Sequence, residues 1–340
     1  MFGRETAKNA SPHDPQHHHH PPGHWHGVVD PSIITTQRGI WAVKWSLLGL
    51  LATASIQAGI VVLSGSVALL ADTIHNFVDA ATAIPLWIAF RVSRLKPSRR
   101  FTYGYGRVED LAGLAIVLSI SLSAITAGYQ SVDRLLSPRE LSYLWAVIGA
   151  SLIGFFGNEA VAVFRIHVGK EIGSAALVTD GYHARADGLT SLAVLFGAVG
   201  VWLGYPLADP LAGLLITLVI FRIVWQSGRS VFTRLLDGVD PEVVEEIKQA
   251  ASTTRGVRDA SEVRVRWVGH RLHAELNVAV DSGHSVEEGH AVAKEVRHQL
   301  LHQLRFLSRA TIHVDPVGAS GEDHHRIVQH VHDDFSAHSH

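Results

Sequence analysis

The stretch that sets the fold is VALLADTIHNFVDAATAIPLWIAF, residues 67–90, an apolar run with ionisable side chains in its interior. About 20 apolar residues are enough to cross the hydrocarbon core of a bilayer, so the run predicts a membrane-spanning helix. Within it, Asp72, His75 and Asp79 have the spacing D-x-x-H-x-x-x-D. Intervals of three and four residues put the three side chains on one face of a helix.

The same pattern returns in a second apolar run, residues 174–203, as Asp180, His183 and Asp187. A His and an Asp four residues apart lie one helical turn from each other, so each helix offers two ligands to one ion. Two such helices supply four N and O donors, the coordination number that Zn²⁺ prefers. The pattern therefore predicts a metal site built from four side chains, which are His75, Asp79, His183 and Asp187.

The two motifs are expected at the same depth in the membrane. The first run passes inward and the second passes outward, and both His–Asp pairs lie about the middle of their runs, at 1.5 Å of rise per residue. The competing interpretation is a set of polar residues that hydrogen-bond inside a helix bundle. However, a charge at the bilayer centre costs about 2.5–3.5 kcal/mol, and facing carboxylates in a low dielectric demand a cation or protons. Asp72 and Asp180, one turn away, are expected to orient the imidazoles or line the ion path, or to be satisfied helix-end acids.

Working outward, six runs are long enough to span the membrane, and they lie at about 40–63, 67–90, 110–133, 144–165, 174–203 and 210–231. The loops on one side carry eleven Lys and Arg residues against two on the other, and the richest is the loop from Arg91 to Arg107. Positive charge marks the cytoplasmic side, so both termini are predicted to be inside. This count places Arg165 in the inner loop between the fourth and fifth runs. The predicted transmembrane domain covers residues 39–235.

Residues 236–317 have the character of a small soluble domain. We expect helices at 241–254 and 285–304, and strands at 262–267, 271–280 and 310–314. Asp240 and Ser285 are predicted N-caps, and Ser285 with Glu288 has the spacing of a capping box. The order α-β-β-α-β predicts a two-layer α+β domain. The fold class is therefore a membrane α-helical bundle of six transmembrane helices followed by a small α+β domain in the cytoplasm.

The composition agrees with this organisation and narrows the chemistry. The 340 residues are 47% hydrophobic and 18% charged, and the net charge of -2 gives no indication of a nucleic-acid partner. The absence of cysteine excludes disulfides and thiolate metal sites, so any metal must be held by His, Asp and Glu. Many of the 23 histidines lie in the tails, 1–38 and 318–340, which are predicted to be disordered. The tails are expected to buffer metal, or to be no more than solvated segments.

At these residues the chain resembles the cation diffusion facilitator family of bacterial zinc transporters. The resemblance covers about residues 38–316 and rests on the paired motifs, on FTYGYGRVEDLAG (101–113) and on the end of the last strand, His313-Val-Asp-Pro. It implies a homodimer in the bacterial inner membrane that exchanges cytoplasmic metal for protons, with Zn²⁺ and often Cd²⁺ as substrate. It also implies a metallochaperone-like (ferredoxin-like) cytoplasmic domain that binds regulatory zinc.

The resemblance also implies roles for residues outside the membrane motifs. His290, His313 and Asp315 stand where ligands of the cytoplasmic zinc site stand, while Ser261 and Asn277 occupy two other ligand positions. His270, His273 and His284 are alternative ligands, or solvated surface histidines. Arg107 and Asp237 match an inter-domain charge contact.

The functional expectation is a divalent metal cation efflux transporter, a Zn²⁺/H⁺ antiporter, and not an enzyme. The chain has no HExxH motif, which a membrane metalloprotease would need. A membrane-anchored metal sensor is the alternative from another class, but an anchor needs no ligands at mid-membrane. Among transporters, Cd²⁺, Co²⁺, Ni²⁺ and Fe²⁺ remain alternative substrates for the same ligands.

Overall fold

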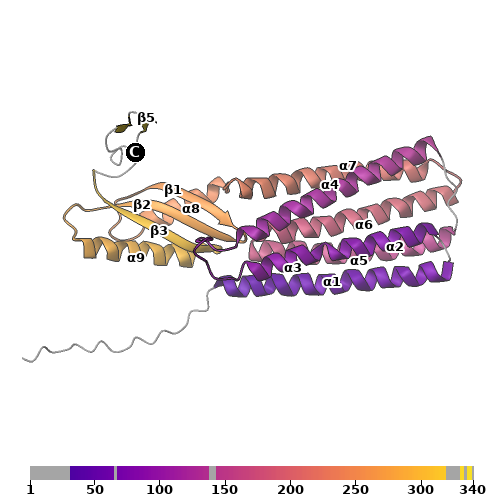
Figure 1. Cartoon of the computed structure of the whole chain (residues 1–340), viewed down its shortest axis with the longest axis horizontal. Helices are drawn as coiled ribbons and strands as arrows, with labels where there is room; N and C mark the ends of the chain where they lie inside the picture. The colour runs from indigo at the N-terminus through magenta and orange to yellow at the C-terminus, as the bar shows by residue number, and fades with distance from the viewer. Residues whose placement is uncertain (1–30, 65–66, 138–142, 319–329, 333–334, 339–340) are drawn as a thin grey trace, which may run out of the picture. The chain divides into compact units, whose positions relative to one another are not determined.

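The computed structural model describes residues 31–64, 67–137, 143–318, 330–332 and 335–338. Its helical part contains five helices that are long and apolar enough to cross a membrane. They are α1 (Pro31–Ser64), α4 (Arg107–Leu136), α5 (Leu144–Ile172), α6 (Ala175–Trp202) and α7 (Ala208–Leu235). Figure 1 shows these helices side by side in one bundle. The buried core of the bundle consists mainly of aliphatic side chains, with Ala42, Leu86, Ile116, Ile120 and Leu177 among its members.

The second predicted span is divided in two in the structure. It forms α2 (Val67–Ala81) and α3 (Ala83–Val92), which follow each other along one line in Figure 1. Pro85 explains the interruption because it has no N–H to donate to the carbonyl of Ala81. Thr82 at the junction donates both its backbone N–H and its hydroxyl to the carbonyl of Asp79, at 3.1 and 2.6 Å. The expectation of one continuous helix was therefore wrong at this point.

The C-terminal domain has the predicted element order. It consists of α8 (Pro241–Ser252), β1 (Asp259–Val268), β2 (Arg271–Val280), α9 (Val286–Gln303) and β3 (Leu307–Pro316). The strand order is β1-β2-β3, with β1 and β2 antiparallel and β2 and β3 parallel. Asp240 caps α8, and Ser285 forms the predicted capping box with Glu288. Side chains of α8 and α9 form one buried core with one face of the sheet, as Ile247, Leu276 and Leu300 show.

Two further short strands, β4 (His330–His332) and β5 (Phe335–His338), pair with each other in the C-terminal tail. The prediction for this tail was disorder, so the structure differs here. A two-stranded hairpin satisfies its own backbone hydrogen bonds locally and has little stability by itself. The sequence therefore gives only a weak signal for such a hairpin. Residues 1–30, most of the predicted N-terminal tail, lie outside the described residues.

A buried polar network joins the bundle to the C-terminal domain. His270, in the β1–β2 turn, lies 2.6 Å from the Glu109 carboxylate through Nδ1, and its Nε2 lies 3.1 Å from the Thr36 hydroxyl. The second oxygen of Glu109 accepts a hydrogen bond of 2.5 Å from Ser174, whose hydroxyl caps α6. His270 and Glu109 are 3% and 1% exposed. The alternative that His270 is a solvated surface histidine was therefore wrong, because its side chain is buried and in contact with a buried carboxylate.

Candidate metal centre

The candidate metal centre is built from two helices, α2 and α6. Asp79 is near the C-terminal end of α2, while His183 and Asp187 lie one turn apart on α6. Ligand atoms of the three residues all lie within 4.8 Å of one another. Within the described part of the chain, this is the one group of three or more His and carboxylate side chains with that property.

The geometry of this group is close to a tetrahedral site. The Nε2 atom of His183 lies 3.9 Å from Oδ1 of Asp79 and 3.8 Å from Oδ2 of Asp187. Ligands at 2.0–2.1 Å from Zn²⁺ in a tetrahedron are about 3.3–3.4 Å apart, so the two distances from His183 are each about half an ångström longer than in a closed site. His183 is 1% exposed, and both of its ring nitrogens are buried without a hydrogen-bond partner among the described residues. An imidazole in this state is ready to ligate an ion.

Close helix packing holds the α6 ligands in place. Gly181 lies two residues before His183 and faces α5, where a Cβ atom would come within 2.7 Å of Cγ1 and 2.9 Å of the backbone N of Ile166. Only glycine permits this approach of the two helices without a shift. The Ser174 cap fixes the beginning of α6. The close packing at Gly181 and the Ser174 cap together fix the axial position and the rotation of α6, and so the positions of His183 and Asp187.

The fourth predicted ligand, His75, belongs to α2, but its side chain lies outside the described residues, as does that of Asp72. The helix places His75 one turn before Asp79. Its neighbour Asn76 donates from Nδ2 to Gln57 Oε1 at 2.7 Å, and Gln57 Nε2 donates to the carbonyl of Ala150 at 3.1 Å. Gln57 was not identified from the sequence, although a buried amide in an apolar span is a detectable signal. This chain of bonds fixes α2 against α1 and α5.

Of the roles predicted for Asp180, its contacts agree with that of a satisfied acid near a helix end. Its Oδ2 lies 3.0 Å from Nη1 of Arg165, and the two side chains are 0% and 1% exposed. Arg165 also donates from Nε to the Ser46 hydroxyl at 2.8 Å. The count of Arg165 among the inner-loop charges was therefore wrong, because α5 continues to Ile172 and buries this residue. Asp180 balances the Arg165 charge, a pairing that was not predicted from the sequence.

A second arginine–carboxylate pair joins the same two helices. Arg185 of α6 contacts Glu159 of α5 through two hydrogen bonds of 3.1 and 2.5 Å. These side chains are about one third exposed, in contrast to Arg165 and Asp180. Arg185 lies between His183 and Asp187 in sequence, yet its charge is directed to Glu159. The α5–α6 interface thus contains one buried and one half-exposed pair, neither of which belongs to the ligand group.

The predicted cytoplasmic site is only partly assembled in the single chain. Nε2 of His313 lies 3.0 Å from Oδ1 of Asp315 on β3. The register of the sheet makes Ser261, Asn277 and His313 neighbours across the three strands. His290 is exposed on α9 and does not join His313 and Asp315 in a group of three within the described residues. A complete site would need ligands from elsewhere.

Arg107 and Asp237 do meet. They form a salt bridge between the beginning of α4 and the segment after α7, and Arg107 also donates to the carbonyl of Arg234 at 2.8 Å. Arg234 lies 4.0 Å over the ring of Trp267 in β1. These contacts, together with the His270–Glu109 pair, surround the junction of the two parts.

Comparison with known proteins agrees with this organisation. The family model of the cation efflux transmembrane domain matches residues 43–236, and that of the cation efflux protein cytoplasmic domain matches residues 239–317. A Mycobacterium tuberculosis protein named "Probable cation efflux system protein" is 52% identical over 303 residues, which cover 88% of this chain and 91% of the relative. An uncharacterized transporter of Methanocaldococcus jannaschii is 28% identical, and the match covers 74% of this chain and 89% of that relative.

Among solved structures, a variant of the MamM CTD matches with 25% identity and a TM-score of 0.22, over 22% of this chain and 95% of that chain. The two family models together extend over the bundle and the α+β domain, and the mycobacterial relative is similar over most of both. The chain therefore belongs to the cation diffusion facilitator family and is an integral membrane protein of divalent metal cation efflux.

Proposed function

We propose that the protein is a Zn²⁺/H⁺ antiporter that moves cytoplasmic zinc out of the cell through Asp79, His183, Asp187 and His75. The observation that carries the proposal is the approach of the first three ligands to within 4.8 Å inside the apolar bundle. Two carboxylates and two imidazoles would neutralise a divalent cation in a medium where an unpaired charge is costly. The borderline character of this donor set suits Zn²⁺, and it also accepts Cd²⁺, Co²⁺, Ni²⁺ or Fe²⁺.

The coupling follows from the chemistry of the ligands. Imidazole ordinarily titrates near neutrality, and a metal ion binds only its neutral form. Zn²⁺ and protons therefore compete for His75 and His183, so that each excludes the other. An inward proton gradient then drives metal outward, provided that the site faces the two sides of the membrane in turn.

The test is zinc uptake into proteoliposomes under an imposed proton gradient. Asp79→Ala and Asp187→Ala are expected to abolish uptake, because each removes a ligand. The matched control is the double variant Glu159→Gln/Arg185→Gln, which removes a carboxylate of α5 and its arginine partner on α6, both outside the ligand group. Normal zinc transport by either ligand variant would refute the site. Competition by the other four metals in the same vesicles ranks the substrates.

Orientation belongs to the same proposal, with both termini in the cytoplasm and the chain in the bacterial inner membrane. Basic residues of the α3–α4 segment support this by the positive-inside rule. The chain has no cysteine, so single introduced cysteines report their side without background. Ser282→Cys should be labelled by an impermeant maleimide only from the cytoplasmic side, and Tyr205→Cys only from the outer side. The reverse pattern would contradict the orientation.

We also propose a homodimer and a regulatory zinc site in the cytoplasmic domain. His313 and Asp315 supply two ligands on β3, and the exposed His290 is available to a second copy. Zinc bound per chain, measured by equilibrium dialysis, should fall by one site in His313→Ala while the transport site stays filled. Mass determination of the detergent-solubilised protein tests the dimer separately. An unchanged zinc count in His313→Ala would exclude the regulatory site.

A further inference from the structure

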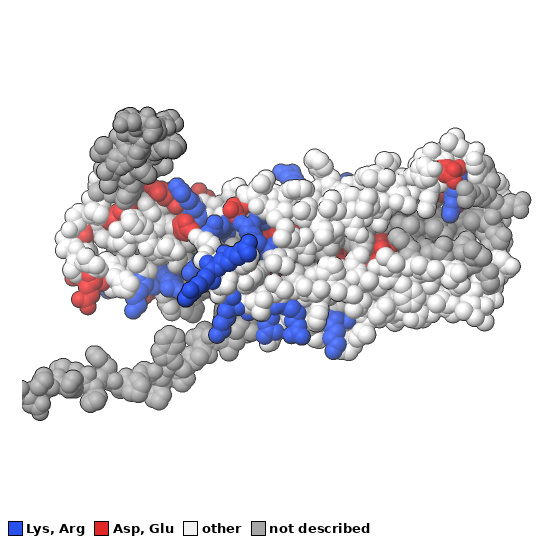
Figure 2. All heavy atoms as spheres, viewed as in Figure 1, with Lys and Arg blue, Asp and Glu red and all other residues white. Residues whose placement is uncertain are grey.

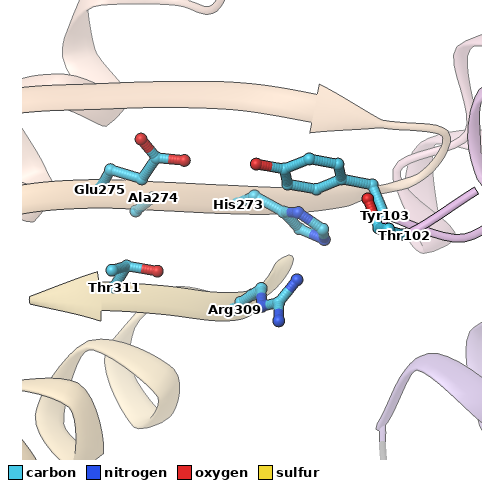
Figure 3. A pocket seen from close by; sticks show the side chains of 7 residues that line it. All are labelled: Thr102, Tyr103, His273, Ala274, Glu275, Arg309 and Thr311. Carbon is cyan, nitrogen blue, oxygen red and sulfur yellow. The ribbon is translucent and has the colours of Figure 1, made fainter. Parts of the chain in front are cut away.

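A polar cavity of about 330 Å³ lies outside the metal centre, between the α3–α4 segment and the sheet. Thr102 and Tyr103 line it from the segment, His273 and Glu275 from β2, and Arg309 and Thr311 from β3. The residues on β2 and β3 alternate with core residues such as Ala274 and Ala310, so they face away from α8 and α9. Figure 3 shows these side chains gathered along the two strands.

The charges of the cavity leave one cation in excess. Among the described residues that line it, the one acid is Glu275, which lies 3.5 Å from Arg266, and Arg266 also lies 4.7 Å over the ring of Tyr103. Arg309 is exposed, and its guanidinium makes no hydrogen bond or ion pair within the described parts of the chain. Glu275 is thus balanced by Arg266, and the charge of Arg309 is available to a ligand.

The remaining polar groups of the cavity are donors that have no partner among the described residues. Nδ1 of His273 is buried and lacks a hydrogen-bond partner among the residues described. The hydroxyls of Thr102, Tyr103 and Thr311 likewise make no hydrogen bond to the described residues. His273 pairs with Arg309 across the β2–β3 register, so the imidazole and the guanidinium are neighbours, as Figure 3 shows.

The electrostatic potential at this place is positive. Burial, followed by the charges of Arg309, Arg266 and Arg271, lowers the pKa of His273 to about 4. The arginines around the neutral imidazole repel a metal cation, whereas its N–H can donate to an anion. The cavity is therefore not a second metal site, despite its histidine and glutamate.

We propose that this cavity binds a phosphate group, either inorganic phosphate or the phosphate monoester of a larger molecule. A guanidinium, an imidazole N–H and three hydroxyls are more donors than a carboxylate can accept, whereas a tetrahedral phosphate presents three or four oxygens. Arg309 supplies the charge, and His273 with Thr311 and Thr102 supplies the orienting bonds.

The surroundings allow two sources of the phosphate. Figure 2 shows Lys and Arg side chains concentrated around the junction of the bundle and the α+β domain, where the α3–α4 segment lies. Basic residues at the end of membrane-spanning helices attract anionic lipid headgroups, and the same field attracts soluble phosphate. The two sources present the same chemical group to Arg309, so the experiment must separate them.

The probe for the soluble source is inorganic phosphate, titrated calorimetrically into the full chain in phosphatidylcholine nanodiscs without zinc. The probe for the lipid source is phosphatidic acid in mixed vesicles with phosphatidylcholine, its retention on the purified protein being counted by mass spectrometry. The test variant is Arg309→Gln, which is exposed and should fold normally. The matched control is Arg297→Gln, the same change at an exposed position on α9.

We expect saturable phosphate binding that Arg309→Gln weakens by roughly 10- to 100-fold, as the loss of a charged hydrogen bond does, and that Arg297→Gln leaves within about twofold. Phosphatidic acid enrichment that is lost only in Arg309→Gln, without binding of free phosphate, would assign the site to a lipid headgroup. The proposal would be overturned if neither inorganic phosphate nor phosphatidic acid bound, or if Arg309→Gln and Arg297→Gln weakened binding equally. Zinc transport is not part of the readout, so failure here leaves the transport site untouched.

Discussion

Asp180→Asn gives the sharpest test of how charge is arranged around the metal centre. The change leaves the Arg165 guanidinium buried beside a neutral amide, whereas the native carboxylate lies 3.0 Å from it with both side chains at most 1% exposed. Two unit charges at that distance attract by about 5.5 kcal/mol at an effective dielectric constant of about 20. Removing one partner of a buried pair costs about 3–5 kcal/mol, since the other charge stays desolvated.

We therefore expect Asp180→Asn to lower the free energy of unfolding by about 3–5 kcal/mol, which is more than a hundredfold in the unfolding equilibrium constant. The assay is reversible unfolding in mixed micelles, followed by tryptophan fluorescence. The double variant Arg165→Met/Asp180→Asn removes both charges and should recover most of the loss. It should also retain zinc affinity, since neither residue belongs to the ligand group.

The matched control is Glu159→Gln, which breaks the other arginine–carboxylate pair of α5 and α6. The side chains of Glu159 and Arg185 are about one third exposed, so water still solvates Arg185 when Glu159 is neutralised. The free energy of unfolding should therefore fall by less than about 1 kcal/mol. The reasoning is refuted if Asp180→Asn is no more destabilising than Glu159→Gln. It is refuted equally if the double variant loses zinc binding, which would make Asp180 part of the ion path.

Three further outcomes follow from particular contacts. His270→Ala leaves the buried Glu109 carboxylate with the Ser174 hydrogen bond but without its His270 partner, so it should lower the melting temperature strongly, while adding Glu109→Gln should restore much of it; two additive losses would contradict a direct coupling of the two side chains. Gly181→Ala should destabilise by about 1–3 kcal/mol and weaken zinc binding measured by calorimetry, since its Cβ would meet the Ile166 backbone. Because the pKa of His273 is lowered to about 4, the unfolded chain binds a proton between pH 6.5 and 4 that the folded chain does not, so stability should fall as the pH falls through this range. His273→Gln should reduce this pH dependence in unfolding curves of the full chain, and an unchanged slope would show that the imidazole titrates normally.

The parts of the fold that the sequence predicted correctly are those that depend on local pattern. The C-terminal elements followed from alternation and from caps such as Ser285, and five of the six predicted membrane helices followed from the length of their apolar runs. The approach of Asp79 to His183 and Asp187 agrees with the same-face spacing of the two motifs and their common depth. The side chain of His75, outside the described residues, remains a prediction.

What the sequence could not predict depends on partners far along the chain. Arg165 reads as a loop charge because it comes at the end of an apolar run, and only the packing of α5 against α6 brings it to Asp180. His270 reads as a surface residue of a polar domain, but it meets Glu109, 161 positions away. A single sequence does not show that Arg165 is close to Asp180, or His270 to Glu109. Arg165 was therefore predicted to lie in a loop, and His270 to be an alternative ligand or a surface histidine.

The two ligand-bearing helices differ in how freely they can move. The beginning of α6 is capped by Ser174, which is bonded to Glu109 and through it to His270, while Asp180 is paired with Arg165 farther along. A displacement of α6 would break buried charge contacts at two levels, each costing several kcal/mol. By contrast, α2 is interrupted at Thr82, three residues after Asp79, and a proline-associated break is a place where a helix bends at little cost. If the site is to face each side of the membrane in turn, we expect Asp79 and α2 to make the larger movement and His183 to stay with α6.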